Sequence, residues 1–396
     1  MSITQAPSRF KSGSIGPVLQ VISSLSELEE MANDWRNLEA VCSDELAYFQ
    51  TYDWCRSWAM LVSAEAGVTQ IRILAVRLGG TLVAVLPLMM SRGPGGVRIL
   101  HNLGEPHSQY AGMVSDPVLF SADAADLVRQ YLDNAPGSDV LRLDMVPERS
   151  RLAELANGAW RLDGNGNESS ALQLQQFATS DDYLASFQGK KARNRARRRR
   201  CLEKAYGDVQ LKEVWPGEPD FERVVRSCIE LKKLWIANTG RISTGFALHS
   251  YADFLVNLPG GRNRREGIVA LALVAGDREV AIEVSMIRQG HMYAYIGGFD
   301  WELRSLSPGK VQMEATVCWA IDNKIEAYDL LGNVADYKES WSNKACALNA
   351  YERTYTIKGW LYAQAWLHMT RPALKKLFMA LPHGARKVLG SRLTPA

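Results

Sequence analysis

The sequence predicts an α/β (α+β) protein made of two similar domains with mixed, largely antiparallel sheets, followed by a basic helical tail. Three observations predict this fold. Residues 267–331 read as three strands, a helix and a fourth strand, and residues 71–145 repeat that order more weakly. Residues 358–396 combine apolar and aromatic side chains with cations and contain no acid. A chain of 396 residues is also long enough for two domains.

The stronger copy has clear boundaries. Apolar segments at Gly267–Ala275, Val280–Ile287 and Met292–Ile296 are separated by Gly-Asp and Arg-Gln-Gly turns, so we expect three antiparallel strands. A helix then begins at Ser307-Pro308-Gly309-Lys310, and Ile325–Leu331 follows it as a short buried strand. Free backbone N–H groups at such a helix start can bind a diphosphate or a carbonyl oxygen.

The weaker copy occupies the N-terminal half. Its expected strands are Ile71–Val76, Thr81–Met90 and Val97–Leu103, followed by a polar loop, a helix over Ala122–Asn134 and a strand over Val140–Met145. Residues 158–170 read as a linker. The expected organisation is therefore a flexible N-terminus at 1–18, an N-terminal domain at 19–165, a C-terminal domain at 175–357 and a tail at 358–396.

Basic residues are concentrated in two places. Lys190–Lys204 holds nine basic residues and one acid, and its spacing predicts a helix that is basic on all sides. Arg353–Ala396 holds eight basic residues and no acid. The rest of the chain is acidic, so these two basic segments indicate that anionic partners bind at these two places. For Lys190–Lys204 the alternatives are a generic anionic surface, donor phosphates or RNA, although the segment lacks aromatic residues that would stack on bases.

The tail from Gly359 to Leu393 has the composition of an interfacial amphipathic helix, because apolar and aromatic residues accompany six cations. A helix docked on the protein body is the alternative. No apolar run is long enough to span a bilayer, and the N-terminus lacks the apolar region of a signal peptide. We therefore expect a cytoplasmic protein that is peripheral at the inner face of the cytoplasmic membrane. The six cysteines show no paired spacing, so neither a metal site nor a disulfide framework is expected.

The C-terminal motifs resemble a known family. Ser-Leu-Ser-Pro-Gly-Lys, a helix, Tyr-Asp-Leu-Leu-Gly-Asn and Asp-Tyr-Lys-Glu-Ser-Trp follow one another as in acyl-CoA N-acyltransferases of the GNAT superfamily, in their cellulose-biosynthesis-protein-like (CelD) and Fem-type branch. Residues 49–58 resemble the start of the same branch, and the resemblance extends from about Leu19 to Ile357. It implies tandem GNAT-like domains, acyl-CoA as a co-substrate and no permanently bound cofactor. The usual Arg/Gln-x-x-Gly-x-Gly/Ala diphosphate loop is reduced here to Ser305–Lys310.

The donor-binding residues implied by the resemblance fall in two groups. Backbone N–H groups beside the bound donor would polarise the thioester carbonyl, and glycines there would allow close approach. The helix start would hold the diphosphate with the help of a lysine. These positions are Gly297, Gly298 and Phe299 for the carbonyl, and Ser307, Pro308, Gly309 and Lys310 for the diphosphate.

Acyl transfer to an amine needs a base, and three residues are candidates. Glu283 is an acid in an otherwise apolar strand, where burial would raise its pKa toward the useful range, although it could equally pair with an arginine. His107 lies in the polar loop after an N-terminal strand, where a neutral imidazole suits this proton transfer. A hydrogen-bonded loop histidine is the alternative. Asp336 is the third candidate.

The leaving thiolate needs a proton donor or a positive charge. Tyr295 and Tyr337 are candidate donors. Lys338 matches the family's Tyr/Phe-Lys position, which the resemblance implies lies near the reacting end of the donor, and a surface lysine is the alternative. Gln109 and Tyr110 share the loop of His107 and are expected to contact the acceptor.

These features predict an N-acyltransferase that moves an acyl group from acyl-CoA, or another acyl thioester, to the amine of a lipid or cell-envelope precursor by direct attack through a tetrahedral intermediate. A sphingoid-type base and an amino sugar are candidate acceptors. An anionic membrane surface is expected as a partner through the tail, and nucleic acid is not. The alternatives are a Fem-type aminoacyl-tRNA-dependent peptidoglycan precursor transferase and a non-catalytic accessory protein of exopolysaccharide synthesis.

Overall fold

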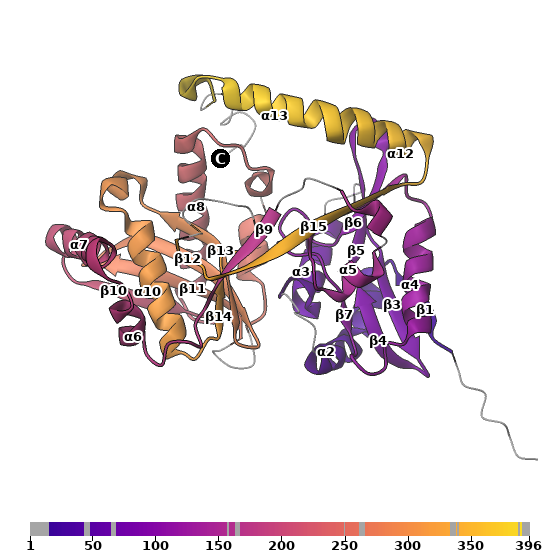
Figure 1. The fold of residues 1–396 in the computed structure, drawn as a ribbon, viewed down its shortest axis with the longest axis horizontal. Helices are drawn as coiled ribbons and strands as arrows, with labels where there is room; N and C mark the ends of the chain where they lie inside the picture. The colour runs from indigo at the N-terminus through magenta and orange to yellow at the C-terminus, as the bar shows by residue number, and fades with distance from the viewer. Residues whose placement is uncertain are drawn as a thin grey trace, which may run out of the picture.

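The protein folds into two α/β halves that lie side by side (Figure 1). A computed structural model describes residues 16–42, 48–64, 69–156, 158–162, 167–248, 250–260, 266–332, 338, 340–386 and 389. Within these residues the N-terminal half and the C-terminal half repeat a similar order of strands and helices, which confirms the predicted α/β class.

The C-terminal half has the strands and helix that the sequence predicts. Its antiparallel strands are β10 (Val209–Val214), β11 (Gly267–Ala275), β12 (Arg278–Arg288) and β13 (His291–Phe299). Helix α10 (Pro308–Asp322) then leads back to β14 (Ala327–Asp329), which runs parallel to β13. Helices α8 (Phe221–Thr239) and α9 (Tyr251–Val256) pack on one face of this sheet. The other face is covered by α10, α6 (Ser180–Ala185) and α7 (Gly189–Tyr206).

The N-terminal half contains helices α1 (Leu25–Glu30), α2 (Ala32–Val41), α3 (Tyr52–Ala64) and α4 (Ala122–Asn134). Its strands are β1 (Val18–Ile22), β2 (Thr69–Ile71), β3 (Ile73–Leu78), β4 (Thr81–Leu86), β5 (Leu88–Arg92), β6 (Arg98–Asn102), β7 (Val114–Ser115) and β8 (Val140–Pro147). The single strand expected over Thr81–Met90 is wrong. The chain breaks at Pro87, which has no N–H for a ladder, so β4 and β5 join different sheets.

Two strands join the halves into one sheet. β9 (Asn167–Gln173) begins inside the segment read as a linker, so that interpretation is wrong for its last residues. β9 pairs with β14 on one side and with β15 (Lys344–Thr354) on the other, and β15 also pairs with β8. Figure 1 shows β9 and β15 crossing between the halves. The 11-stranded sheet has the order β10-β11-β12-β13-β14-β9-β15-β8-β6-β5-β2, and β1-β3-β4-β7 form a second sheet.

An aromatic cluster fills the space between the halves. Phe49, Trp54 and Tyr110 of the N-terminal half make ring contacts with Tyr293 and Tyr295 of β13, and all five belong to or pack against the largest buried cluster. Buried aromatic pairs of this kind stabilise a contact beyond the area they bury. The two halves are therefore packed together along the first half of β13.

The tail forms consecutive helical segments, α12 (Ile357–Leu361), η6 (Tyr362–Thr370) and α13 (Arg371–Ala380), as predicted. They lie across both halves in Figure 1. The tail begins against the N-terminal half, where Gly359 approaches the carbonyl of Asp139 so closely that a Cβ would lie 1.9 Å from its oxygen. Ala363 and Leu367 are buried there. Among the described residues, none of the helices is both long enough and apolar enough to cross a bilayer.

Candidate functional site

The parallel strands β13 and β14 of the C-terminal half diverge after a short paired segment. We call the point where they diverge the parting. β13 pairs with β14 only from His291 to Tyr293, and β13 then continues to Phe299. In the described part of the chain, no strand pairs with β13 on that side beyond Tyr293. After β14 the backbone turns away through Leu331, whose φ is 64°. Backbone N–H groups left unpaired at such a parting can bind the carbonyl oxygen of a ligand.

The two glycines predicted at this parting have different surroundings. A Cβ on Gly298 would lie 2.7 Å from the carbonyl oxygen of Cys228 in α8, so helix packing alone accounts for this glycine. Gly297 is exposed, and a Cβ there would meet no atom within 4 Å. Gly297 is the cross-strand partner of Glu283, and cross-strand partners share one face of a sheet. Open space therefore lies beside the position of Glu283.

Glu283 is buried in β12 and makes two hydrogen bonds through its carboxylate. Tyr328 of β14 donates its phenolic O–H to Oε2 at 2.8 Å, and Ser285 donates its hydroxyl to Oε1 at 2.8 Å. Burial raises the pKa of Glu283 to about 7, although both hydrogen bonds lower it. No arginine contacts this carboxylate among the described residues, so the alternative of an arginine pair is wrong. A carboxyl with this pKa can accept a proton near neutral pH.

The helix start after β13 offers few free donors. Ser307 has a φ of 57° and is followed by Pro308, which has no N–H. The N–H groups of Lys310 and Val311 both donate to the carbonyl of Ser307. Gly309 lies against the ring of Phe299, where a Cβ would be 3.3 Å from the ring, and the Lys310 side chain is exposed. Gly309 N–H and the Lys310 ammonium are therefore the groups that could meet a phosphate.

Lys338 binds the turn that follows β14. Its Nζ donates to the carbonyl oxygens of Leu331 at 3.0 Å and Gly332 at 2.7 Å. The pKa of Lys338 is lowered to about 8, mainly by burial, with Asp329 opposing the shift and the charge of Lys232 adding to it. Because Lys338 is buried, the alternative of a surface lysine is wrong.

Asp329 ends β14 and binds the N-terminal half. Tyr110 donates its O–H to both carboxylate oxygens of Asp329 at 2.9 Å, and His291 Nε2 lies 3.3 Å from Oδ2. Gln109 donates to the carbonyl of His107 at 3.2 Å. Asp329 belongs to the Tyr-Asp-Leu-Leu-Gly-Asn motif, but no role was predicted for it from the sequence. An acid at the end of a short buried strand, followed by Leu-Leu-Gly, was the signal that could have indicated it.

His107 and Tyr295 meet across the two halves. Tyr295 donates its O–H to the carbonyl of His107 at 3.1 Å and accepts one from Tyr251 at 2.9 Å. The imidazole contacts the ring of Tyr251 in a tilted arrangement, with ring centroids 4.0 Å apart. Burial lowers the pKa of His107 to about 4 and raises the pKa of Tyr295. These surroundings favour a packing role for His107 over a role as a base. Asp336 and Tyr337 lie outside the described residues.

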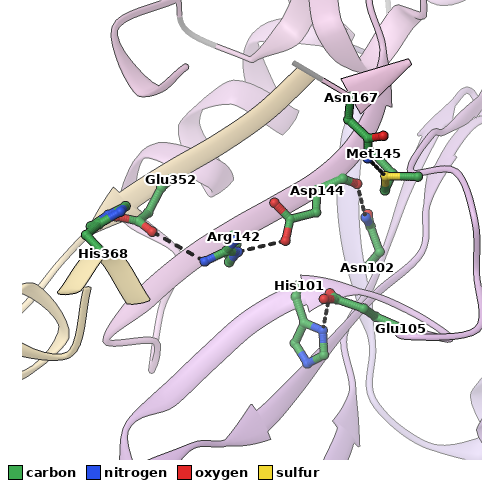
Figure 2. Close-up of polar contacts among 9 residues, drawn as sticks. All are labelled: His101, Asn102, Glu105, Arg142, Asp144, Met145, Asn167, Glu352 and His368. Atoms are coloured by element: carbon green, nitrogen blue, oxygen red, sulfur yellow. Dashed lines mark hydrogen bonds and ion pairs between the residues drawn. The ribbon is translucent and has the colours of Figure 1, made fainter. Parts of the chain in front are cut away.

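The corresponding parting in the N-terminal half is filled by polar side chains (Figure 2). β6 and β8 pair only at Ile99–Leu100 with Val140–Leu141. Beyond these pairs, the amide of Asn102 donates to the carbonyl of Asp144 at 3.3 Å. Figure 2 shows Arg142 between Asp144 and Glu352, with His101 and Glu105 in contact beside them. The open parting is therefore the one in the C-terminal half.

Comparisons with known proteins agree with this geometry. Residues 190–339 match the family model described as acetyltransferase (GNAT) domain. The fold is similar to the crystal structure of FemX, with 11% identity, 85% of this chain and 98% of that chain covered, and a TM-score of 0.59. It is also similar to the C-terminal DUF2156 domain of a protein assigned as a lysylphosphatidylglycerol synthetase from Agrobacterium fabrum, with 11% identity, coverage of 85% and 96%, and a TM-score of 0.52. No curated protein matches the chain. Residues 190–339 therefore match a GNAT acetyltransferase domain, and the chain as a whole shares its fold with these two solved structures.

Proposed function

We propose that the protein is an N-acyltransferase that transfers an acyl group from a thioester donor, acyl-CoA in the first instance, to the amine of a lipid or cell-envelope precursor. The observation that carries this proposal is the parting of β13 and β14, with the buried Glu283 bonded to Tyr328 of β14 and the buried Lys338 bonded to the turn that follows β14. A thioester placed in the parting would lie next to open space at Gly297.

Glu283 is the proposed base. The amine attacks the thioester carbonyl, and a C–N bond forms as a tetrahedral intermediate. The nitrogen then loses its proton to the Glu283 carboxylate, whose pKa of about 7 suits this transfer. Unpaired N–H groups of β13 around Gly297 stabilise the oxyanion of the intermediate.

Lys338 is the proposed proton donor for the leaving group. When the intermediate collapses, the C–S bond breaks and the sulfur leaves as a thiolate. A cysteine-type thiol has a pKa of about 8.5, which is close to the pKa of about 8 that burial gives Lys338. The ammonium of Lys338 therefore protonates the thiolate with little free-energy cost, and solvent returns the proton from Glu283 to Lys338 after product release.

The acceptor class is supported by the tail. Met369 is 69% exposed and Leu377 is 64% exposed, and Trp360 and Leu374 are also exposed. Lys375 and Lys376 lie among these apolar residues, and no acid follows Arg353. An exposed helix with apolar and cationic residues binds the interface of an anionic bilayer. We propose that the tail holds the protein at such a surface, where a lipid-borne amine is available.

The test is transfer by the purified full chain. It is incubated with acyl-CoAs of several chain lengths and with a sphingoid base, an amino sugar or a membrane lipid amine, with and without vesicles that contain phosphatidylglycerol. Free thiol release and amide formation by mass spectrometry are both followed. Coupled thiol release and amide formation with one donor and one acceptor supports the proposal. Absence of both with every acyl-thioester donor contradicts it.

A further inference from the structure

The outward face of α7 carries a continuous stripe of positive charge. Its residues are spaced three or four positions apart, so they share one face of the helix. They extend over about 21 Å at the rise of an α-helix. All five are exposed: Lys190, Arg193, Arg197, Arg200 and Lys204. We call these residues the α7 stripe. Lys191 and Arg199 are exposed as well, whereas Arg195 is held inward.

Arg195 and Arg199 lie outside the stripe and have partners within the protein, and of the two only Arg195 is largely buried. Arg195 pairs with Glu314 of α10 and donates to the Tyr183 hydroxyl, and its guanidinium lies 3.7 Å from the ring centroid of Phe187. Arg199 donates to the carbonyl of Val209. Its other contact is Glu203, the acid of this helix. No residue of the α7 stripe forms an ion pair with another described residue, so the charge of the stripe is available to a partner.

The α7 stripe lies beside the proposed donor loop. Leu202 on the inward side of α7 packs in one apolar cluster with Leu303, which precedes the loop, and with Val311 in the first turn of α10. Helix α7 also contacts α10 and the segment from Trp301 to Leu306. A partner bound along α7 would therefore be held next to Ser307–Lys310.

The donor loop itself is a poor site for a diphosphate. Pro308 has no N–H, and the N–H groups of Lys310 and Val311 already donate to the carbonyl of Ser307. One phosphate could meet Gly309 N–H and the Lys310 ammonium. A phosphopantetheine arm on a carrier protein needs only such a site for one phosphate. It has the same thiol arm as coenzyme A, but it is attached through a single phosphodiester and has no adenosine diphosphate group.

We propose that the α7 stripe docks an acidic acyl carrier protein, which delivers the acyl group as a thioester on its phosphopantetheine arm. This inference rests on the proposed function and names its donor. Acids spaced three or four residues apart on a partner helix match the stripe in spacing and in charge. Single-stranded RNA is disfavoured because the outward face of α7 offers no aromatic ring for base stacking. The bond changes are those of the proposed reaction, and the free thiol remains on the carrier.

The test compares one acyl chain on an acidic holo-carrier protein with the same chain on coenzyme A, using the same amine. Three proteins are assayed: the wild type, the stripe variant Arg197→Glu/Arg200→Glu, and the matched control Arg92→Glu/Arg149→Glu, which reverses two exposed cations of the N-terminal half. Equal melting temperatures establish that the variants are folded. We expect kcat/KM with the acyl carrier protein to fall at least about tenfold in the stripe variant, mainly through KM, and to fall with added salt in the wild type.

The same stripe variant should keep its rate with acyl-CoA, and the control should keep its rate with both donors. An unchanged rate of the stripe variant with the acyl carrier protein, or equal losses with both donors, would overturn the inference while leaving the proposed function in place. Transfer that occurs only from an aminoacyl-tRNA and is lost in the stripe variant would assign the stripe to RNA and also overturn it. Failure of transfer from every acyl thioester would instead refute the proposed function.

Discussion

Tyr328 donates a hydrogen bond of 2.8 Å to the buried carboxylate of Glu283, and this contact joins β14 to β12 across the intervening strand β13. The bond stabilises the ionised carboxylate and lowers the pKa of Glu283. Tyr328→Phe should therefore raise the pKa of Glu283 above about 7. Because the base must be ionised, the acidic limb of the rate profile should move to higher pH by about 0.5 to 1 pH unit.

The measurement is kcat/KM for acyl transfer as a function of pH. Tyr131→Phe is a suitable control because Tyr131 lies in α4 of the N-terminal half, away from Glu283. An acidic limb that stays in place in Tyr328→Phe would show that Glu283 is not the group that titrates.

Lys338 should set the alkaline limb of the same profile. A proton donor must be protonated, so the wild-type rate should fall as the pH rises through about 8, the pKa of Lys338. Lys338→Met should lower kcat by about tenfold or more and remove this limb. Lys338→Arg keeps the charge and should move the limb to higher pH, since arginine does not lose its proton in this range. A purely structural role would lower stability without changing the shape of the profile.

Arg195 and Arg197 lie two positions apart on α7 and should differ in their effect on stability. Arg195 is largely buried against Phe187, Trp341 and Glu314, so Arg195→Ala would leave the Glu314 carboxylate without its partner. We expect the free energy of unfolding to fall by about 3 kcal/mol. Arg197 is exposed, and Arg197→Ala should change it by less than about 0.5 kcal/mol. Urea unfolding of both variants measures the difference, and equal effects would contradict the burial of Arg195.

The exposed apolar residues of the tail should control binding to vesicles. Leu374→Gln/Leu377→Gln removes two of them, and binding to phosphatidylglycerol vesicles in a sedimentation assay should fall about tenfold or more. Val118→Gln is the control because Val118 is 84% exposed in the N-terminal half. If the tail variant and the control bind vesicles like the wild type, the tail does not hold the protein at a bilayer.

Local patterns predicted much of the fold. The strand at Gly267–Ala275 and the helix at Ala122–Asn134 have the predicted boundaries, and β12 extends the predicted strand Val280–Ile287 by two residues at its start and one at its end. The continuity of the large sheet could not be predicted in this way. It depends on β9, a strand whose polar residues Glu168, Ser169 and Ser170 look like a linker, and on pairing partners far away in the sequence.

The site was predicted in part, for a similar reason. A single acid in an apolar strand identified Glu283 as a residue of interest, but its partner Tyr328 comes from a strand 45 residues later in the chain. The spacing of Lys190–Lys204 indicated a basic helix but not its orientation, because the inward position of Arg195 depends on Glu314 and Trp341. Contacts between distant segments thus decide the chemistry of residues that the sequence can only nominate.

The most direct test of the proposed function is the pH dependence of amide formation by the wild type and by Glu283→Gln, from about pH 5.5 to about pH 9. The wild-type rate should rise through about pH 7 as Glu283 ionises, and Glu283→Gln should be slower by about a hundredfold or more near pH 8 and lack this rise. A Glu283→Gln protein with the wild-type rate and the same acidic limb would contradict Glu283 as the base of the reaction.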